Sequence, residues 1–196
     1  MHLAWLALWW FAAPFWEAKS PSEWTHAELA RLLNDSPWAQ MATCESRIGG
    51  ASRVRVLLAT ARPVQEAEQQ ARLGAARRAG APAGIDEDYI EFLRNDASRH
   101  IVVAVSGTTL ETMSNGDETR QMEKDCVMKV GRKKYKMTGH FPPSARDSYL
   151  RLIFPRVAVD SDKEIVFELY VPGAMPPYRE AYFKVRDLYY KGKLEM

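Results

Sequence analysis

The sequence predicts an α+β fold, with N-terminal helices and a strand–helix–helix–strand unit followed by an antiparallel, β-rich C-terminal half. Helix-capping residues and helical spacing of apolar side chains predict the helices, which lie mainly before His100. Short runs of alternating apolar and polar residues, separated by turn residues, predict the strands that follow Asp125. A length of 196 residues favours one domain that is large enough to bury a core.

The first helix of the predicted globular part begins after Thr25. Thr25 and Glu28 have the spacing of a capping box, in which each side chain accepts a hydrogen bond from an otherwise free backbone N–H. The three leucines between residues 29 and 33 share one face of that helix. Pro37 marks its end, because proline restricts the preceding residue and cannot continue the helical hydrogen bonds.

A strand–helix–helix–strand unit is expected over residues 53–105. Residues 53–60 begin with strand-like alternation, and Pro63 and Gly80 then mark the two ends of a helix. Asp86 is a suitable N-cap for a second helix. Residues 100–105 are almost wholly apolar, as is typical of a central strand that is covered on both faces. Parallel pairing of the two strands is one alternative.

Residues 108–123 are polar and are interpreted as a loop with at most one helical turn. Beyond them, residues 126–130 and 133–138 flank Gly131-Arg132, which predicts a two-residue hairpin turn with glycine in first place. Further strand-like runs continue to residue 194. Their spacing fits an antiparallel sheet, a sandwich or a barrel.

The predicted hairpin carries a cluster of basic residues and is the strongest candidate for a contact site. Its tip can bind phosphate, an acidic polysaccharide or an anionic lipid. The alternative is that these lysines only protect an edge strand from aggregation and bind nothing. The candidate anion-contact residues are Lys129, Arg132, Lys133, Lys134 and Lys136.

The N-terminus resembles the apolar part of a secretory signal. Residues 1–16 contain no Asp, Glu, Lys or Arg and are rich in Trp, Leu and Phe. We therefore predict a signal-peptide-like segment over residues 1–18, a globular domain over 19–196, and export to the periplasm or the extracellular space. The absence of a basic residue before this run and the poor cleavage site around Ala18 leave two alternatives, an uncleaved membrane anchor and a docked structural helix.

Two cysteines, Cys44 and Cys126, are present. In an exported protein they can form a disulfide. The alternative is a pair of buried free thiols, since cysteine is among the residue types most often buried.

The sequence contains no recognisable catalytic, metal or cofactor motif. The histidines at positions 2, 26, 100 and 140 lack the spacing of a zinc site. Ser106 follows an apolar strand and could be imagined in a triad with His100 or His140 and Asp96, but no nucleophile-elbow motif surrounds it. A net charge of +2 is too small to indicate a nucleic-acid partner.

The segment from Trp24-Thr25 to Ser36-Pro37-Trp38-Ala39, together with the C-terminal residues 190–195, resembles a group of uncharacterised bacterial exported proteins. Members of that group share a helix that begins at a tryptophan, a Ser-Pro-Trp-Ala step and a β-rich remainder. The resemblance covers a small part of the chain. It implies export and carries no known chemistry.

These features together favour a non-enzymatic exported domain that acts through contacts with a protein or with the cell envelope. The alternative is a binder of a small apolar or lipid-like ligand in the β-rich half, where aromatic residues are frequent. A large pocket lined by Tyr and Phe would favour the ligand binder, whereas a filled core would favour the contact domain.

Overall fold

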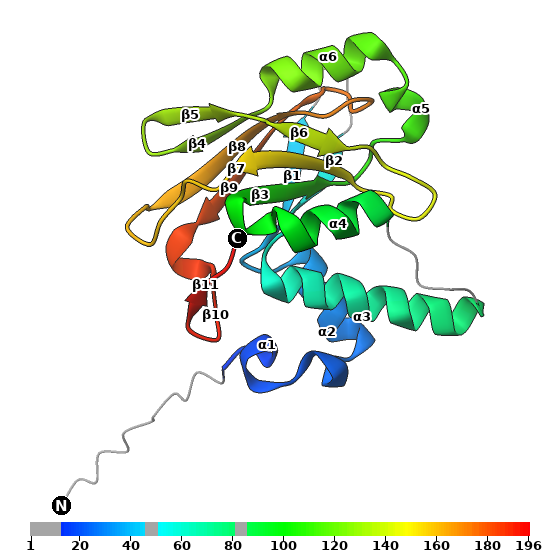
Figure 1. Cartoon of the computed structure of the whole chain (residues 1–196), viewed down its shortest axis with the longest axis vertical. Coiled ribbons are helices and arrows are strands. Elements are labelled where there is room, and N and C mark those ends of the chain that lie inside the picture. Colours follow the sequence, from blue (N-terminus) through cyan, green and yellow to red (C-terminus); the bar gives the residue numbers. More distant parts are fainter. Residues whose placement is uncertain (1–12, 46–50, 81–85) are drawn as a thin grey trace, which may run out of the picture.

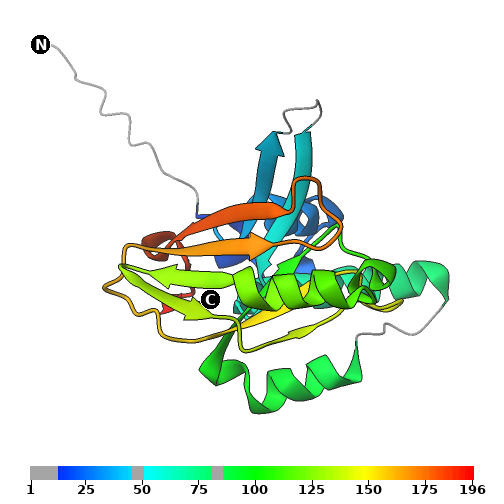
Figure 2. The same cartoon turned by 90° about the horizontal axis from the view of Figure 1, so that it is seen from above.

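The computed structural model describes residues 13–45, 51–80 and 86–196, and it confirms the α+β class (Figure 1). Two antiparallel sheets pack face to face, and helices cover the outer side of the first sheet (Figure 2). No helix in these ranges combines the length and the apolar character needed to cross a membrane.

The helices within the described ranges are α1 (Phe15–Ala18), α2 (His26–Asn34), α3 (Arg62–Ala79), α4 (Glu87–Asn95), α5 (Leu110–Met113) and α6 (Gly116–Asp125). Three short 3-10 helices are η1 (Pro21–Glu23), η2 (Ala97–Arg99) and η3 (Val185–Asp187). The predicted capping box of α2 is confirmed, because the Glu28 N–H donates to Thr25 Oγ1 at 3.2 Å and the Thr25 N–H donates to Glu28 Oε2 at 2.8 Å. The predicted Asp86 cap of α4 and the Gly80 end of α3 are confirmed as well.

The first sheet has the strand order β1-β2-β3-β7-β6, and every neighbouring pair in it is antiparallel. Its central strand β3 is buried along almost its whole length, as its apolar sequence predicts. The strands of this sheet are β1 (Ala39–Glu45), β2 (Ala51–Leu58), β3 (His100–Val105), β6 (Gly139–Phe141) and β7 (Leu150–Pro155).

The alternative of parallel pairing between β2 and β3 is wrong. Leu57 faces Ala104 in an antiparallel register. The physical reason is that two helices, α3 and α4, separate the strands. A single crossover helix would carry the chain back to the start of the sheet, but a second helix returns it to the end that it left.

The polar stretch 108–123 was expected to be a loop, and that expectation is wrong for most of it. Helix α6 begins at an Asn115 cap, whose side chain accepts from the Asp117 N–H at 3.0 Å. Met122 is its fully buried anchor, and the rest of the helix is largely polar and exposed. Because so few apolar residues of α6 face the core, the sequence shows no clear helical period of apolar residues.

The second sheet has the order β5-β4-β8-β9 and is also antiparallel. A small hairpin of two further strands closes the chain near α1 (Figure 1). The strands of the second sheet and of this hairpin are β4 (Val127–Val130), β5 (Lys133–Lys136), β8 (Glu164–Tyr170), β9 (Tyr178–Lys184), β10 (Tyr189–Tyr190) and β11 (Lys193–Leu194).

The two sheets are joined along both edges, which gives a sandwich with a barrel-like outline. On one side, β5 runs into β6 through two residues, and the Thr138 N–H donates to the Ile153 carbonyl of β7 at 2.8 Å. On the other side, the side-chain amide of Gln40 on β1 bonds both backbone groups of Tyr182 on β9, accepting from its N–H at 3.0 Å. Gln40 thereby pairs part of the edge of β9.

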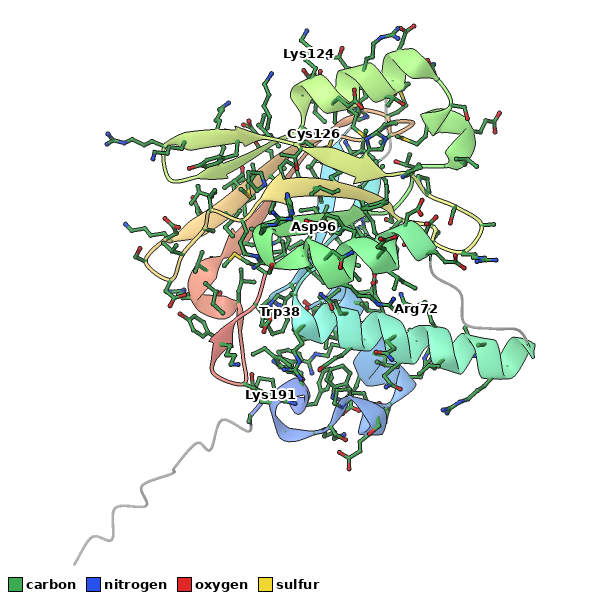
Figure 3. The ribbon with its side chains drawn as sticks, in the orientation of Figure 1. Trp38, Arg72, Asp96, Lys124, Cys126 and Lys191 are labelled. Atoms are coloured by element: carbon green, nitrogen blue, oxygen red, sulfur yellow. The ribbon has the colours of Figure 1, made fainter. Side chains whose placement is uncertain are left out.

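The N- and C-terminal parts of the described chain meet in an aromatic cluster. Trp38 (Figure 3) is fully buried. Its ring lies edge-on to Trp16 of α1 and to Tyr190 of β10. The Trp38 Nε1–H donates to the carbonyl of Glu195 at 2.9 Å. The Ser-Pro-Trp-Ala step and the C-terminal segment, which carry the sequence resemblance, are thus in direct contact.

Candidate functional site

The outward side of the second sheet, here called the open face, is the candidate functional site. Its inward side chains, such as Met128, Phe167 and Phe183, are fully buried. The alternating outward side chains are mostly exposed and polar, as the burial pattern of β9 illustrates. The outward residues are Val127, Lys129, Lys134, Lys136, Glu164, Val166, Glu168, Tyr170, Tyr178, Glu180, Tyr182 and Lys184.

The predicted basic hairpin forms one edge of this face. Gly131 has a φ of +58°, which a side chain would disfavour, and Val130 pairs with Lys133 across the turn. The predicted hairpin is therefore confirmed. Lys134 and Lys136 point to the open face, whereas Tyr135 points inward and packs on the core.

The hairpin cations fall into two groups. Glu168 on β8 accepts from both Lys129 and Lys134, the latter at 3.2 Å, and these lysines hold the pKa of the Glu168 carboxyl below its usual value. Arg132, Lys133 and Lys136 form no ion pair with any other described residue and are exposed. The hairpin therefore has three cations without an ion pair among the described residues, and two more that share the single carboxylate of Glu168.

Two tyrosines on β9 expose aromatic surface beside these charges. Tyr178 is 55% exposed and Tyr182 is 49% exposed. The Tyr178 hydroxyl donates to Asp125 at 2.7 Å, and the Tyr182 hydroxyl donates to Glu180. Each hydrogen bond raises the pKa of its tyrosine, so both phenols stay protonated donors at neutral pH. The rings lie four residues apart along one strand face, which is roughly 13 Å.

The open face is hollowed on both sides of Glu180. One hollow of about 500 Å3 lies between Lys129, Glu164 and Tyr182. A second hollow of about 370 Å3 lies between Lys134, Glu168 and Tyr178. The face thus combines cations, carboxylates and aromatic rings around two shallow depressions.

Sequence reasoning found the cations of this site, considered Tyr182 only as a residue of an apolar pocket, and missed Tyr178 and the acids. Glu168, Glu180, Tyr178 and Tyr182 lie thirty or more residues beyond the hairpin in the chain. Their alternation with buried residues signals an outward orientation. Only the strand order and the register place them beside Lys129 and Lys134.

The interior between the two sheets is packed with aromatic rings. Phe167 lies 5.2 Å from Phe154 and 5.9 Å from Phe183, measured between ring centroids, and all three are fully buried. Two of the tyrosines in the β-rich half, Tyr182 and Tyr189, are exposed, whereas Tyr170 is buried. The inner layer of the β-rich half is therefore a filled core.

The residues of the imagined triad are not brought together. His100 begins β3 and Ser106 follows its last residue, so roughly 20 Å of strand separates them. His100 Nδ1 contacts the backbone carbonyl of Asp96 at 3.0 Å, and Ser106 Oγ accepts from the Arg55 N–H at 3.0 Å. His140 lies 3.7 Å from Glu123, away from Ser106. No cluster of three His, Cys, Asp or Glu side chains suited to a metal ion occurs in the described part of the chain.

Cys126 is a free, fully buried thiol at the end of α6 (Figure 3). Its Sγ accepts from the Tyr170 N–H at 3.3 Å, and burial raises the pKa of the thiol to about 12. The side chain of Cys44 lies outside the described residues, and so does the predicted pairing with it.

Comparison with protein-family models, with curated proteins and with solved structures finds no match for this chain.

Proposed function

We propose that this protein is a non-enzymatic exported domain that binds an acidic polysaccharide of the cell envelope on its open face. The observation that carries the proposal is the presence, on one sheet face, of Lys136 with the exposed rings of Tyr178 and Tyr182, next to the hairpin turn that adds Arg132 and Lys133 at its tip. Export rests on the apolar N-terminal sequence.

Each component of the face suits a different part of such a polymer. Arg132, Lys133 and Lys136 attract carboxylate or sulfate groups at long range. The rings of Tyr178 and Tyr182 offer flat apolar surface to sugar rings, while their hydroxyls and the nearby carboxylates can exchange hydrogen bonds with sugar hydroxyls. A purely anionic surface such as a bilayer would use only the cations.

The test measures binding of the full chain to heparin and to polygalacturonate at low and moderate salt. Replacing Arg132, Lys133 and Lys136 together with Ser should weaken binding by about 100-fold, if each cation contributes about 1 kcal/mol as basic groups do beside an anionic surface. A matched control replaces Arg53, Arg94 and Lys193 with Ser. These residues are exposed elsewhere, so the same net charge is lost and binding should be retained.

Two further variants separate the polysaccharide from other partners. Glu168→Gln releases Lys129 and Lys134 from their shared carboxylate and should strengthen binding. Tyr178→Ser with Tyr182→Ser should weaken binding to polysaccharide and leave binding to phosphatidylglycerol vesicles unchanged. Equal loss in the hairpin and control variants, or a tyrosine variant that binds polysaccharide like the parent chain, would contradict the proposal.

A further inference from the structure

A groove between α2 and α3 has the composition of a ligand site and shares no lining residue with the open face. It encloses about 360 Å3, within the range of roughly 300 to 1,000 Å3 that is usual for small-molecule pockets. Both helices and the segment that precedes α2 line it, at the end of the molecule where α1 lies (Figure 1). The lining residues are Ser22, Trp24, His26, Leu29, Ala30, Leu33, Gln70, Ala71, Leu73, Gly74, Arg77 and Arg78.

Small residues create this groove. Ala30 on α2 and both Ala71 and Gly74 on α3 line it. A Cβ added to Gly74 would meet only the flexible end of Arg78, at 3.8 Å. Bulky side chains at these positions would interdigitate and close the gap, as they do in ordinary helix packing. The leucines and Trp24 give the groove an apolar wall.

The polar part of the groove is basic. Arg77 and Arg78 from the last turns of α3 and His26 from the start of α2 line it, and no Asp or Glu does. The ion pairs within α3 join Arg62 to Glu66 and Arg72 to Glu68, and in the described chain Arg77 and Arg78 have none. An anionic group entering the groove would meet two available guanidinium groups.

Trp24 contributes a buried ring to the apolar wall. Its side chain is 6% exposed, and its indole Nε1–H is buried without an acceptor among the described residues. Buried donors nearly always have an acceptor, because an unpaired one costs about 1–3 kcal/mol. Because the Trp24 Nε1 has almost no solvent-accessible surface, a ligand in the open groove cannot reach it, and Trp24 offers only its ring to the groove.

From these features we infer that the α2–α3 groove binds a single-chain anionic amphiphile of the fatty-acid type. The apolar chain lies against Trp24, Leu29 and Leu33, and the carboxylate is held by Arg77 and Arg78. The apolar wall and the acid-free basic end together select a molecule that has both parts. This site lies in the helical layer, not in the β-rich half where the sequence placed the lipid-like alternative.

The test uses dodecanoate below its micelle concentration, titrated into the full chain by calorimetry. Ala30→Leu should fill the groove and abolish detectable binding. Ala27→Leu is the matched control, since Ala27 lies on the same helix, is exposed and does not line the groove. Both substitutions preserve helix propensity, and circular dichroism checks that both variants fold.

The charge requirement is tested separately. Arg77→Gln with Arg78→Gln should weaken dodecanoate binding about tenfold or more, which corresponds to loss of about 1.4 kcal/mol. The same variant should bind the neutral alcohol dodecanol like the parent chain. Equal dodecanoate affinity in Ala30→Leu and Ala27→Leu, or no binding of dodecanoate to the parent chain, would overturn the inference.

Discussion

The guanidinium of Arg151 is buried between two carboxylates and a tyrosine. Its Nε donates to Asp147 at 2.6 Å, its Nη2 to both oxygens of Glu68 at 3.1 and 3.2 Å, and its Nη1 to the Tyr89 hydroxyl at 3.3 Å. Burial acts to lower the pKa of Arg151, but the two carboxylates hold it above its usual value. This network ties α3, α4 and β7 together on the outer side of the first sheet.

Arg179 is equally buried but has no such partners. Its exposure is 3%, its Nη1 donates to the Pro176 and Tyr178 carbonyls, and its Nε and Nη2 have no acceptor among the described residues. The two arginines therefore make a natural contrast, because one is compensated by acids and the other only by carbonyl groups.

We predict opposite tolerance to the same substitution at these two sites. Arg151→Met leaves the Glu68 and Asp147 carboxylates buried without a counter-ion and should lower the free energy of unfolding by about 3–5 kcal/mol. Arg179→Met removes two unpaired donors and should change it by less than about 1 kcal/mol in either direction. Urea unfolding of both variants measures this difference. A similar loss of unfolding free energy in both variants would contradict the idea that Glu68 and Asp147 make Arg151 the less replaceable of the two arginines.

We predict that the buried thiol of Cys126 is alkylated slowly in the folded protein. Because burial raises the pKa of its thiol to about 12, the reactive thiolate is scarce at pH 8. Cys126 should resist iodoacetamide in the folded protein and react on unfolding in urea. Mass spectrometry of tryptic peptides measures this. A peptide containing Cys126 linked to the Cys44 peptide, in protein purified without reductant, would instead establish the disulfide.

At the scale of helices and strands, local signals predicted the elements that carry their own start and stop residues. The Thr25–Glu28 box, the Asp86 cap and the Gly131 turn each act within a few residues, so the sequence alone identified them. Strand β1 and helix α6 lack a clean period, and neither was predicted. Tertiary contacts decide such segments, as Met122 does for α6.

Relations between elements were less accessible to the sequence. The antiparallel pairing of β2 with β3 depends on the direction in which α3 and α4 pack. The Gln40 contact with β9 joins residues 142 positions apart. The candidate site shares this property, since Glu168 meets Lys129 and Lys134 only through strand register. The sequence alone identified the basic residues of the hairpin, but only the strand order showed that Glu168 pairs with Lys129 and Lys134.

For the molecule as a whole, the N-terminal helix α1 is part of the packed structure. Trp16 is 9% exposed and lies edge-on to Trp38, with ring centroids 5.9 Å apart. Phe15 lies 5.9 Å from Trp24, and the Glu17 carboxylate accepts from the Lys191 N–H at 2.9 Å. These residues fall within the predicted signal-like segment 1–18. Its boundary stays a prediction, and cleavage after Ala18 would remove Trp16 from the core.

We therefore predict that two N-terminal truncations differ sharply in stability. Removing residues 1–12 leaves α1 in place and provides the reference form. Removing residues 1–18 deletes the rings of Phe15 and Trp16 and should cost about 3–5 kcal/mol, as loss of a buried Trp does. For a domain of this size that corresponds to a fall of roughly 10 °C in melting temperature. Calorimetric melting of both forms measures the effect, with Trp16→Ala in the full chain as the matched single-residue test. If the two truncations melt together, Trp16 contributes nothing to the core, and the folded domain begins at residue 19.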